Sequence, residues 1–93
     1  MIITVETIKL YAPWVNSLKE KRTVVKSIIA KIKNKFNVSI AEVDSQDLHK
    51  TIILGIALVS GTKALGDSIM DKLNSYLQNI TDAEIIEIFR ETR

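Results

Sequence analysis

The sequence has no cysteine, and this absence excludes disulfide bonds, thiolate zinc sites and cysteine-based catalysis together. It has only three glycines and a single proline, Pro13, and no glycine-rich phosphate loop can be assembled from it. The longest apolar stretch, residues 51–59, is about half the length that a membrane-spanning helix requires. The first residues lack the basic and apolar regions of a signal peptide. These absences favour a soluble, cytoplasmic protein with no membrane partner.

Acidic residues are scarce in one segment of the chain. The net charge of +2 is too small to predict nucleic-acid binding by itself. Residues 17–36, however, contain seven of the thirteen basic residues and a single acid, Glu20, whereas the rest of the chain has six basic and ten acidic residues. This segment therefore carries a charge of +6, against −4 elsewhere. Its basic residues are Lys19, Lys21, Arg22, Lys26, Lys31, Lys33 and Lys35.

The apolar pattern predicts six secondary-structure elements within one domain that spans all 93 residues. Ser17 followed by Glu20 is the pattern of a capping box, in which each side chain bonds the backbone N–H of the other residue. Residues 60–62 are expected to form a turn, and Thr62 is expected to cap the start of the second helix. The predicted strands are residues 2–11, 38–43, 51–60 and 84–90, and the predicted helices are residues 17–36 and 63–79.

The predicted order is strand, helix, strand, strand, helix, strand. With a hairpin in the middle and right-handed crossovers, this order predicts a ferredoxin-like βαββαβ sandwich of the α+β class. Such a fold has a four-stranded antiparallel sheet with two helices on one face. The strand at residues 51–60 is apolar at both alternating sets of positions, which predicts a central strand that is buried on both faces.

Three segments carry a resemblance to a known family: MII at the start, SLKEKR at residues 17–22 and FNVSIAEVDSQD at residues 36–47. Together they resemble the YlxP-like proteins, a bacterial domain-of-unknown-function family of about this length. The resemblance covers the whole chain and implies a ferredoxin-like fold. It also implies an association with translation, because family members are often encoded near translation-initiation and ribosome-maturation genes. It implies no activity or catalytic residue, and the chain departs from the family pattern at Thr4 and Glu6.

The basic helix is the sharpest functional signal in the residues themselves. Four of its basic side chains fall within about 60° of one another on a helical wheel, beside the apolar stripe. Lys21 lies toward the apolar side, where it must find a partner or extend to the surface. One interpretation is a site for nucleic-acid phosphates; the other is a helix face that is only solvated or faces a protein. The candidate phosphate contacts are Lys19, Lys21, Arg22, Lys26 and Lys33.

Trp14, the only tryptophan, joins this candidate site, because an exposed aromatic ring beside basic side chains can stack on bases. The alternative is that its ring packs over the open end of the core. The pattern argues against RNA binding of the RNA-recognition-motif type, since that domain stacks bases on aromatics of its central strands and residues 51–60 contain none. The same residues leave an aliphatic sheet face that no helix covers, which indicates homodimerisation, either through this face or by pairing of sheet edges.

The polar loop at residues 44–50 is the remaining candidate. Asp44, Asp47 and His49 are the only cluster with metal-binding potential, but the loop lacks the glycine and the terminal glutamate of a calcium loop, so no metal is expected. The SQD part of this loop belongs to the segments that resemble the family. We therefore expect Ser45, Gln46 and Asp47 to form an interaction surface.

No catalytic constellation can be assembled from the remaining residues. An acylphosphatase-like enzyme would need an arginine in the loop at residues 11–16, and a heavy-metal chaperone would need two cysteines there. We therefore expect a non-enzymatic module with no cofactor and no small-molecule substrate. Two hypotheses stay open: a module that associates with RNA or a ribosomal particle through its basic helix, and a homodimeric protein-interaction module with no nucleic-acid role.

Overall fold

The computed structural model describes all 93 residues and contains the six predicted elements in the predicted order. The first and third strands have the predicted bounds, the second strand begins one residue later than predicted, and the last strand extends two residues further. The strands are β1 (Ile2–Tyr11), β2 (Ser39–Asp44), β3 (Thr51–Ser60) and β4 (Glu84–Thr92), and the helices are α1 (Leu18–Lys35) and α2 (Lys63–Ile80).

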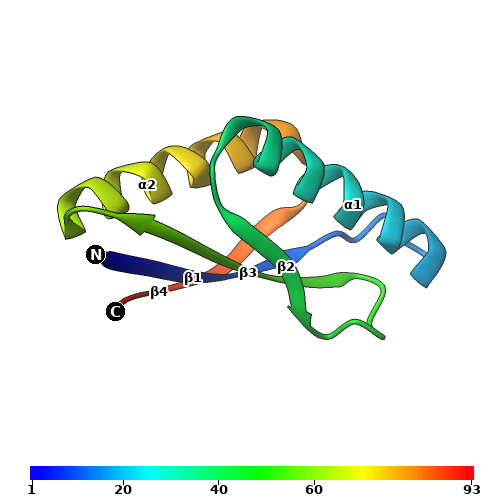
Figure 1. Ribbon diagram of the computed structural model, residues 1–93. Helices are drawn as coiled ribbons and strands as arrows, with labels where there is room; N and C mark the ends of the chain where they lie inside the picture. The colour runs from blue at the N-terminus through cyan, green and yellow to red at the C-terminus, as the bar shows by residue number, and fades with distance from the viewer.

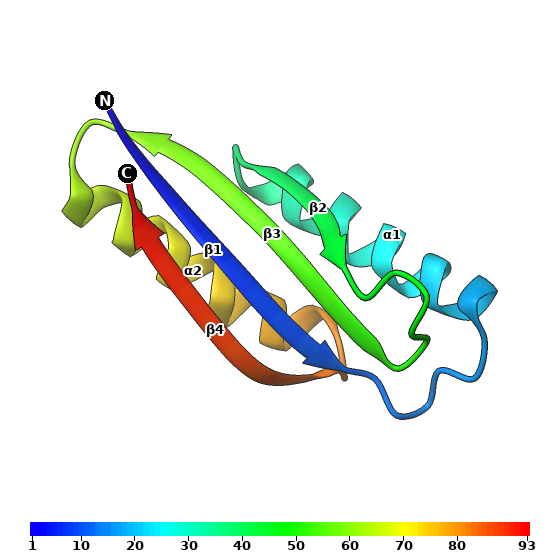
Figure 2. The same cartoon turned by 90° about the horizontal axis from the view of Figure 1, so that it is seen from below.

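The four strands form one sheet in the order β2-β3-β1-β4, and all neighbouring pairs are antiparallel. Both helices lie on the same face of this sheet, so the molecule has two layers (Figure 1). Viewed from below, the sheet lies in front, with α1 behind the β2 half and α2 behind the β4 half (Figure 2). This arrangement confirms the predicted ferredoxin-like βαββαβ sandwich.

Side-chain caps fix where both helices begin. Ser17 Oγ accepts a hydrogen bond from the backbone N–H of Glu20 at 3.1 Å, and Thr62 Oγ1 accepts one from Leu65 N–H at 3.1 Å. The second hydrogen bond of the predicted capping box is not formed. The Glu20 carboxylate accepts from Asn16 N–H at 3.4 Å instead of from Ser17 N–H. The cap therefore also orders the loop that precedes α1.

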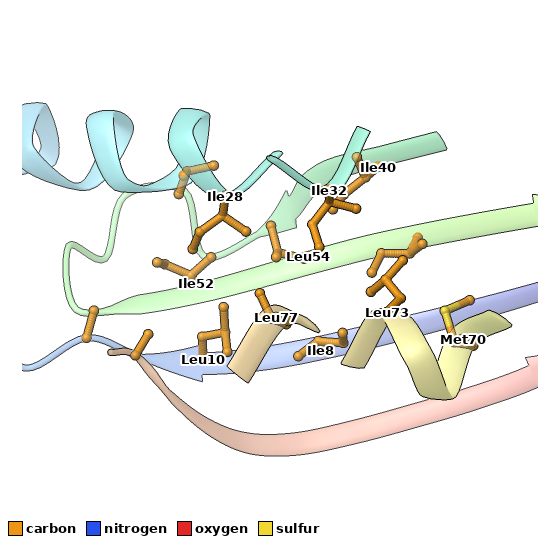
Figure 3. Packing of buried hydrophobic residues seen from close by; sticks show 14 of the residues in the cluster. Ile8, Leu10, Ile28, Ile32, Ile40, Ile52, Leu54, Met70, Leu73 and Leu77 are labelled. Carbon is orange, nitrogen blue, oxygen red and sulfur yellow. The ribbon is translucent and has the colours of Figure 1, made fainter. Parts of the chain in front are cut away.

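The hydrophobic core fills the space between the sheet and the two helices. Alternate residues of the central strands point toward the helices, as the two-residue period of a strand requires. Figure 3 shows Ile8 and Leu54 of the sheet interleaved with Ile32 of α1 and Leu73 of α2. Full burial of each such side chain contributes roughly 1.5–3 kcal/mol of hydrophobic free energy. This core holds α1 in place and presents its opposite side to solvent.

Gly66 allows the start of α2 to lie against the sheet. A Cβ atom at this position would stand 2.9 Å from Ser60 Oγ and closer still to Thr4 Oγ1. A glycine within a helix costs about 0.5–1 kcal/mol relative to alanine. Here the missing Cβ makes room for two buried hydroxyl groups, so alanine would force the helix away from β1 and β3.

The second face of the sheet carries no helix and is called the open face below. In β3 its residues Ile53 and Ala57 are half-buried, and Val59 is 64% exposed. The prediction that β3 is central is confirmed, but the prediction that both its faces are buried is wrong, because both helices cover the same side. By strand register the open face comprises Ser39, Ala41, Val43, Ile53, Gly55, Ala57, Val59, Ile3, Val5, Thr7, Lys9, Glu87, Phe89 and Glu91.

Candidate nucleic-acid interface

The exposed side of α1 carries a row of cations that we call the basic stripe: Lys19, Arg22, Lys26 and Lys33. All four side chains are exposed, and none forms an ion pair or a side-chain hydrogen bond. Thr23 Oγ1 donates to the backbone carbonyl of Lys19 at 3.3 Å, a bond that leaves the Lys19 side chain free. The stripe therefore keeps its donors and its charge available to a ligand.

Lys21 does not belong to this stripe, although the sequence made it a candidate phosphate contact. Its residue is only 1% exposed, and its ammonium lies 2.7 Å from the carboxylate of Glu42 on β2. The same Nζ donates to the carbonyl oxygens of Ser45 at 2.7 Å and Leu48 at 2.6 Å. Two hydrogen bonds and one ion pair hold this buried ammonium inside the protein, so Lys21 is not available to a phosphate. Its predicted position toward the apolar side is explained by these partners.

Lys50 at the start of β3 makes a second contact of the same kind. Its Nζ donates to the carbonyl oxygens of Pro13 at 2.6 Å and Val15 at 2.9 Å, and to Asn16 Oδ1 at 3.4 Å. The backbone N–H of Ala12 also donates to the carbonyl of Lys50 at 2.8 Å. The loop between β1 and α1 is therefore held in one conformation by a cation from another part of the chain.

These two lysines tie together the two loops at one end of the molecule. Lys21, which follows the first loop, holds the carbonyls of the second, and Lys50, which ends the second loop, holds the carbonyls of the first. Figure 2 shows both loops beside the start of α1, away from the chain termini. The first residues of the basic stripe therefore lie next to two loops whose conformations are fixed by internal hydrogen bonds.

Trp14 lies in the first of these loops with its side chain partly accessible. The residue is 41% exposed, whereas the neighbouring Ala12 and Val15 are fully buried in the core. The ring is thus neither sealed into the end of the core nor fully solvated. It stands on the same end of the molecule as the start of α1, where the sequence placed it as a candidate for base stacking.

The SQD residues lie in the second loop. Ser45 is the only non-glycine residue with a positive φ, 55°, and its N–H donates to Asp44 Oδ1 at 2.7 Å. Gln46 and Asp47 are exposed, and their side chains have no partner in the protein. Because Lys21 binds the Ser45 carbonyl, the turn presents these two side chains to solvent. No group of three His, Cys, Asp or Glu side chains in the protein is close enough to hold a metal ion.

A buried acidic network under α2 was not anticipated from the sequence. Glu6 of β1 has a fully buried side chain and pairs with Arg90 of β4 at 3.0 Å, while Asn74 donates to the same Glu6 oxygen at 3.2 Å. Arg90 also reaches Asp71 at 2.7 Å and Asp67 at 3.5 Å. Burial raises the pKa of Glu6, although the hydrogen bonds from Asn74 and Arg90 oppose that shift. This network joins α2 to the β4 edge and explains how the chain accommodates a glutamate on the helix-facing side of β1.

The end of α1 contacts α2 through an aromatic pair. Phe36 and Tyr76 meet edge-to-face with ring centroids 5.8 Å apart, and the ammonium of Lys35 lies 4.3 Å from the centre of the Tyr76 ring. Lys35 is therefore engaged with the protein. Lys31 is exposed and has no partner, and it lies on the other flank of the helix from the basic stripe.

Comparison with known proteins places the chain in a family. Residues 3–90 match the model of a family described as "Protein of unknown function (DUF503)". The chain belongs to this family. It is also 37% identical over 68 residues to the Uncharacterized protein YlxP of Bacillus subtilis (strain 168), a match that covers 73% of this chain and 74% of that protein. Both findings confirm the YlxP-like resemblance of the sequence.

A solved structure supports the fold independently. A de novo designed protein with a ferredoxin fold, LFR1 1, whose structure was determined by solution NMR, is similar with a TM-score of 0.55. The match covers 100% of this chain and 85% of the designed chain at 17% sequence identity. At that identity the similarity shows the fold alone. In the protein itself, neither helix has an apolar run sufficient for a transmembrane span.

Proposed function

We propose that this protein is a small non-enzymatic module that binds structured RNA, such as the RNA of a ribosomal particle, through the phosphate backbone. The basic stripe on α1 makes the contacts. The observation that carries the proposal is the distribution of unpaired cations. Seven Lys or Arg side chains make no ion pair, hydrogen bond or ring contact, and five of them, Lys19, Arg22, Lys26, Lys31 and Lys33, lie on α1.

The dimensions of the stripe suit a phosphate backbone. From Lys19 to Lys33 the helix rises by about 21 Å at 1.5 Å per residue, which spans several successive phosphates. Long, flexible lysine side chains adapt to phosphates without fixed geometry, and this favours recognition of backbone and shape over sequence. Trp14 stands at the start of the stripe, where its accessible ring can stack on an unpaired base at the edge of an RNA helix.

A homodimeric protein-interaction module is the second candidate function. The observation that favours it is the open face, where apolar side chains such as Val59 and Phe89 are more than half exposed. The two functions use opposite sides of the molecule, since α1 lies on the helix side of the sheet. A dimer through the open face would therefore leave the basic stripe of each copy accessible.

RNA retention by charge-reversed variants tests the proposal. Replacing two residues of the stripe together, Arg22→Glu with Lys26→Glu, should weaken binding to a structured ribosomal RNA fragment by at least about tenfold in low salt. The control is Lys63→Glu with Lys72→Glu on α2, which changes the net charge by the same amount at exposed positions but also removes the ion pair of Lys63 with Asp67. Filter binding or gel retardation gives the affinities, and thermal unfolding verifies that both variants remain folded.

The control decides between a defined site and general attraction. The proposal expects the α2 pair to retain most of the affinity of the unmodified protein. Equal losses in the two double variants would mean that only net charge matters, and no loss in the α1 variant would refute the proposed site.

A further inference from the structure

The open face contains a hollow that its own residues leave unfilled. The hollow has a volume of about 470 Å³ and lies over the small residues Ala41, Gly55 and Ala57. On the β2 side it is bounded by Val43, whose side chain lies so close over Gly55 that a Cβ there would stand 2.7 Å from Val43 Cγ1. Glycine and alanine at these positions therefore lower the surface of the sheet in front of β2 and β3.

The same face carries a projecting aromatic ring on its opposite edge. Phe89 of β4 is 63% exposed, the largest exposure of any aromatic residue in the protein. Strand pairing places it in one cross-strand row with the hollow, since Ala41 pairs with Gly55, Gly55 with Thr7, and Thr7 with Phe89. The ring therefore forms the β4 edge of the hollow, at the same level along the strands as Ala41 at its β2 edge.

This symmetry in the row points to a second copy of the chain as the occupant. Sheet neighbours are about 4.8 Å apart, so Ala41 and Phe89 lie at equal distances on either side of a line that runs between β3 and β1. A two-fold axis parallel to the strands above that line brings Phe89 of each copy over Ala41 of the other. We propose that the protein forms a face-to-face homodimer in which each Phe89 ring enters the hollow beside Ala41 and Gly55 of the other copy.

The composition of the face fits such an interface. The central row, Ala41, Gly55, Thr7 and Phe89, has no charge, and the charged residues lie in the rows next to it: Lys9, Asp44, Glu87 and Glu91. The same two-fold axis places Glu91 over the partner's Ser39, because the register aligns Ser39, Ala57, Val5 and Glu91 in the next row. A serine hydroxyl can donate to a carboxylate, so this contact is complementary, whereas in the row on the other side Glu87 comes near the partner's Asp44 and both acids stay at the exposed rim.

The available area is sufficient for a stable dimer. The molecule measures 41 × 21 × 18 Å, and the open face forms one of its broad sides. A protein–protein interface of standard size buries about 800 Å² on each partner, and two sheets that pack face to face lie about 10 Å apart. The proposal does not depend on RNA binding, because α1 lies on the far side of the sheet in each copy (Figure 1).

A charge-complementation experiment tests the contact between Phe89 and Ala41. Light scattering after size exclusion, at micromolar concentration, should give a dimer for the unmodified protein. Phe89→Lys and Ala41→Glu should each raise the dissociation constant by at least about tenfold and elute as monomers, since each buries unpaired charges twice. Leu65→Lys, at an exposed apolar position on α2, is the matched control and should remain dimeric.

Mixing the two monomeric variants then identifies the geometry. In a heterodimer the introduced lysine meets the introduced glutamate at one contact, and the other contact keeps its native Phe89 and Ala41. The mixture of Phe89→Lys with Ala41→Glu should therefore form dimers that neither variant forms alone. A monomeric unmodified protein, a dimer that survives Phe89→Lys, or a mixture that remains monomeric would each overturn the proposal. Both positions are exposed, and thermal unfolding verifies that the variants fold.

Discussion

Two neighbouring cations on α1 have opposite surroundings. Lys21 is buried, forms an ion pair with the Glu42 carboxylate and donates to two carbonyl groups, whereas Arg22 is exposed and has no partner. One step of 100° along the helix separates them, and this rotation takes a side chain from the sheet to the solvent. A count of basic residues treats the two alike. The difference teaches that only the cations without internal partners are available for a ligand, and on α1 these form the basic stripe and Lys31.

Removing the ammonium of Lys21 should produce the largest change in stability. Lys21→Met keeps most of the aliphatic side chain but leaves the Glu42 carboxylate without its counter-ion and the loop carbonyls of Ser45 and Leu48 without their donor. We expect the free energy of unfolding to fall by about 2–4 kcal/mol. Urea unfolding of both proteins at the same protein concentration measures this difference in free energy.

The adjacent Arg22→Met is the matched control for this prediction. It removes an exposed cation of the same helix, so its effect should remain within about 0.5 kcal/mol. Similar changes in the two variants would contradict the division between a structural cation and a free one.

Lys50 extends the comparison to the other loop and has a smaller expected effect. Lys50→Ala removes the donor to Pro13 and Val15 carbonyls, which lie nearer the surface than those bound by Lys21. We expect a loss of about 1 kcal/mol in the free energy of unfolding. The loop should also become more mobile, and fluorescence anisotropy of Trp14, the only tryptophan, reports this directly. An unchanged anisotropy would show that Lys50 does not order the loop.

Glu6 is the second buried charged residue, and the question is whether burial of its carboxylate lowers the free energy of unfolding. Its pKa is raised by burial above the ordinary value of 4.5, so protonation stabilises the fold, and this stabilisation is lost as pH rises through the raised pKa. Glu6→Gln cannot titrate. At neutral pH we expect a small net effect, because the loss of the Arg90 ion pair and the relief of burying a charge oppose each other.

The pH dependence is the sharper measurement for Glu6. The stability of the unmodified protein relative to Glu6→Gln should be greatest at acidic pH, below 4.5, and should decrease as pH rises above it. Unfolding by urea across this range measures the difference. A difference that grows with pH would mean that the ion pair with Arg90 outweighs burial.

Much of the fold was predictable because its signals are local. The ten-residue strands β1 and β3 have the predicted bounds, and the caps at Ser17 and Thr62 are at the predicted residues. The burial of both β3 faces was predicted wrongly, because an apolar alternate face does not reveal whether a helix or another molecule covers it. The half-exposed Val59 shows the consequence.

The candidate site was only partly predictable, since its decisive contacts join distant residues. The helical period placed Lys19, Arg22 and Lys26 together, and it placed Lys21 toward the apolar side. It gave no partner for Lys21, because Glu42 and the loop carbonyls become neighbours only when β2 folds against α1. The contacts of Lys50 and of the Glu6 network likewise carry no sequence signal, because a periodicity describes one element and these bonds link two.

The salt dependence of RNA affinity tests the central claim most directly. If four phosphates contact the basic stripe, the logarithm of the association constant should fall with the logarithm of salt concentration with a slope of about −3 to −4. The exposed pair Arg22→Gln with Lys26→Gln should reduce that slope by about 1.5–2, whereas Lys21→Met, measured where it is fully folded, should leave it unchanged. An equal reduction by Lys21→Met, or an unchanged slope for the exposed pair, would contradict the account.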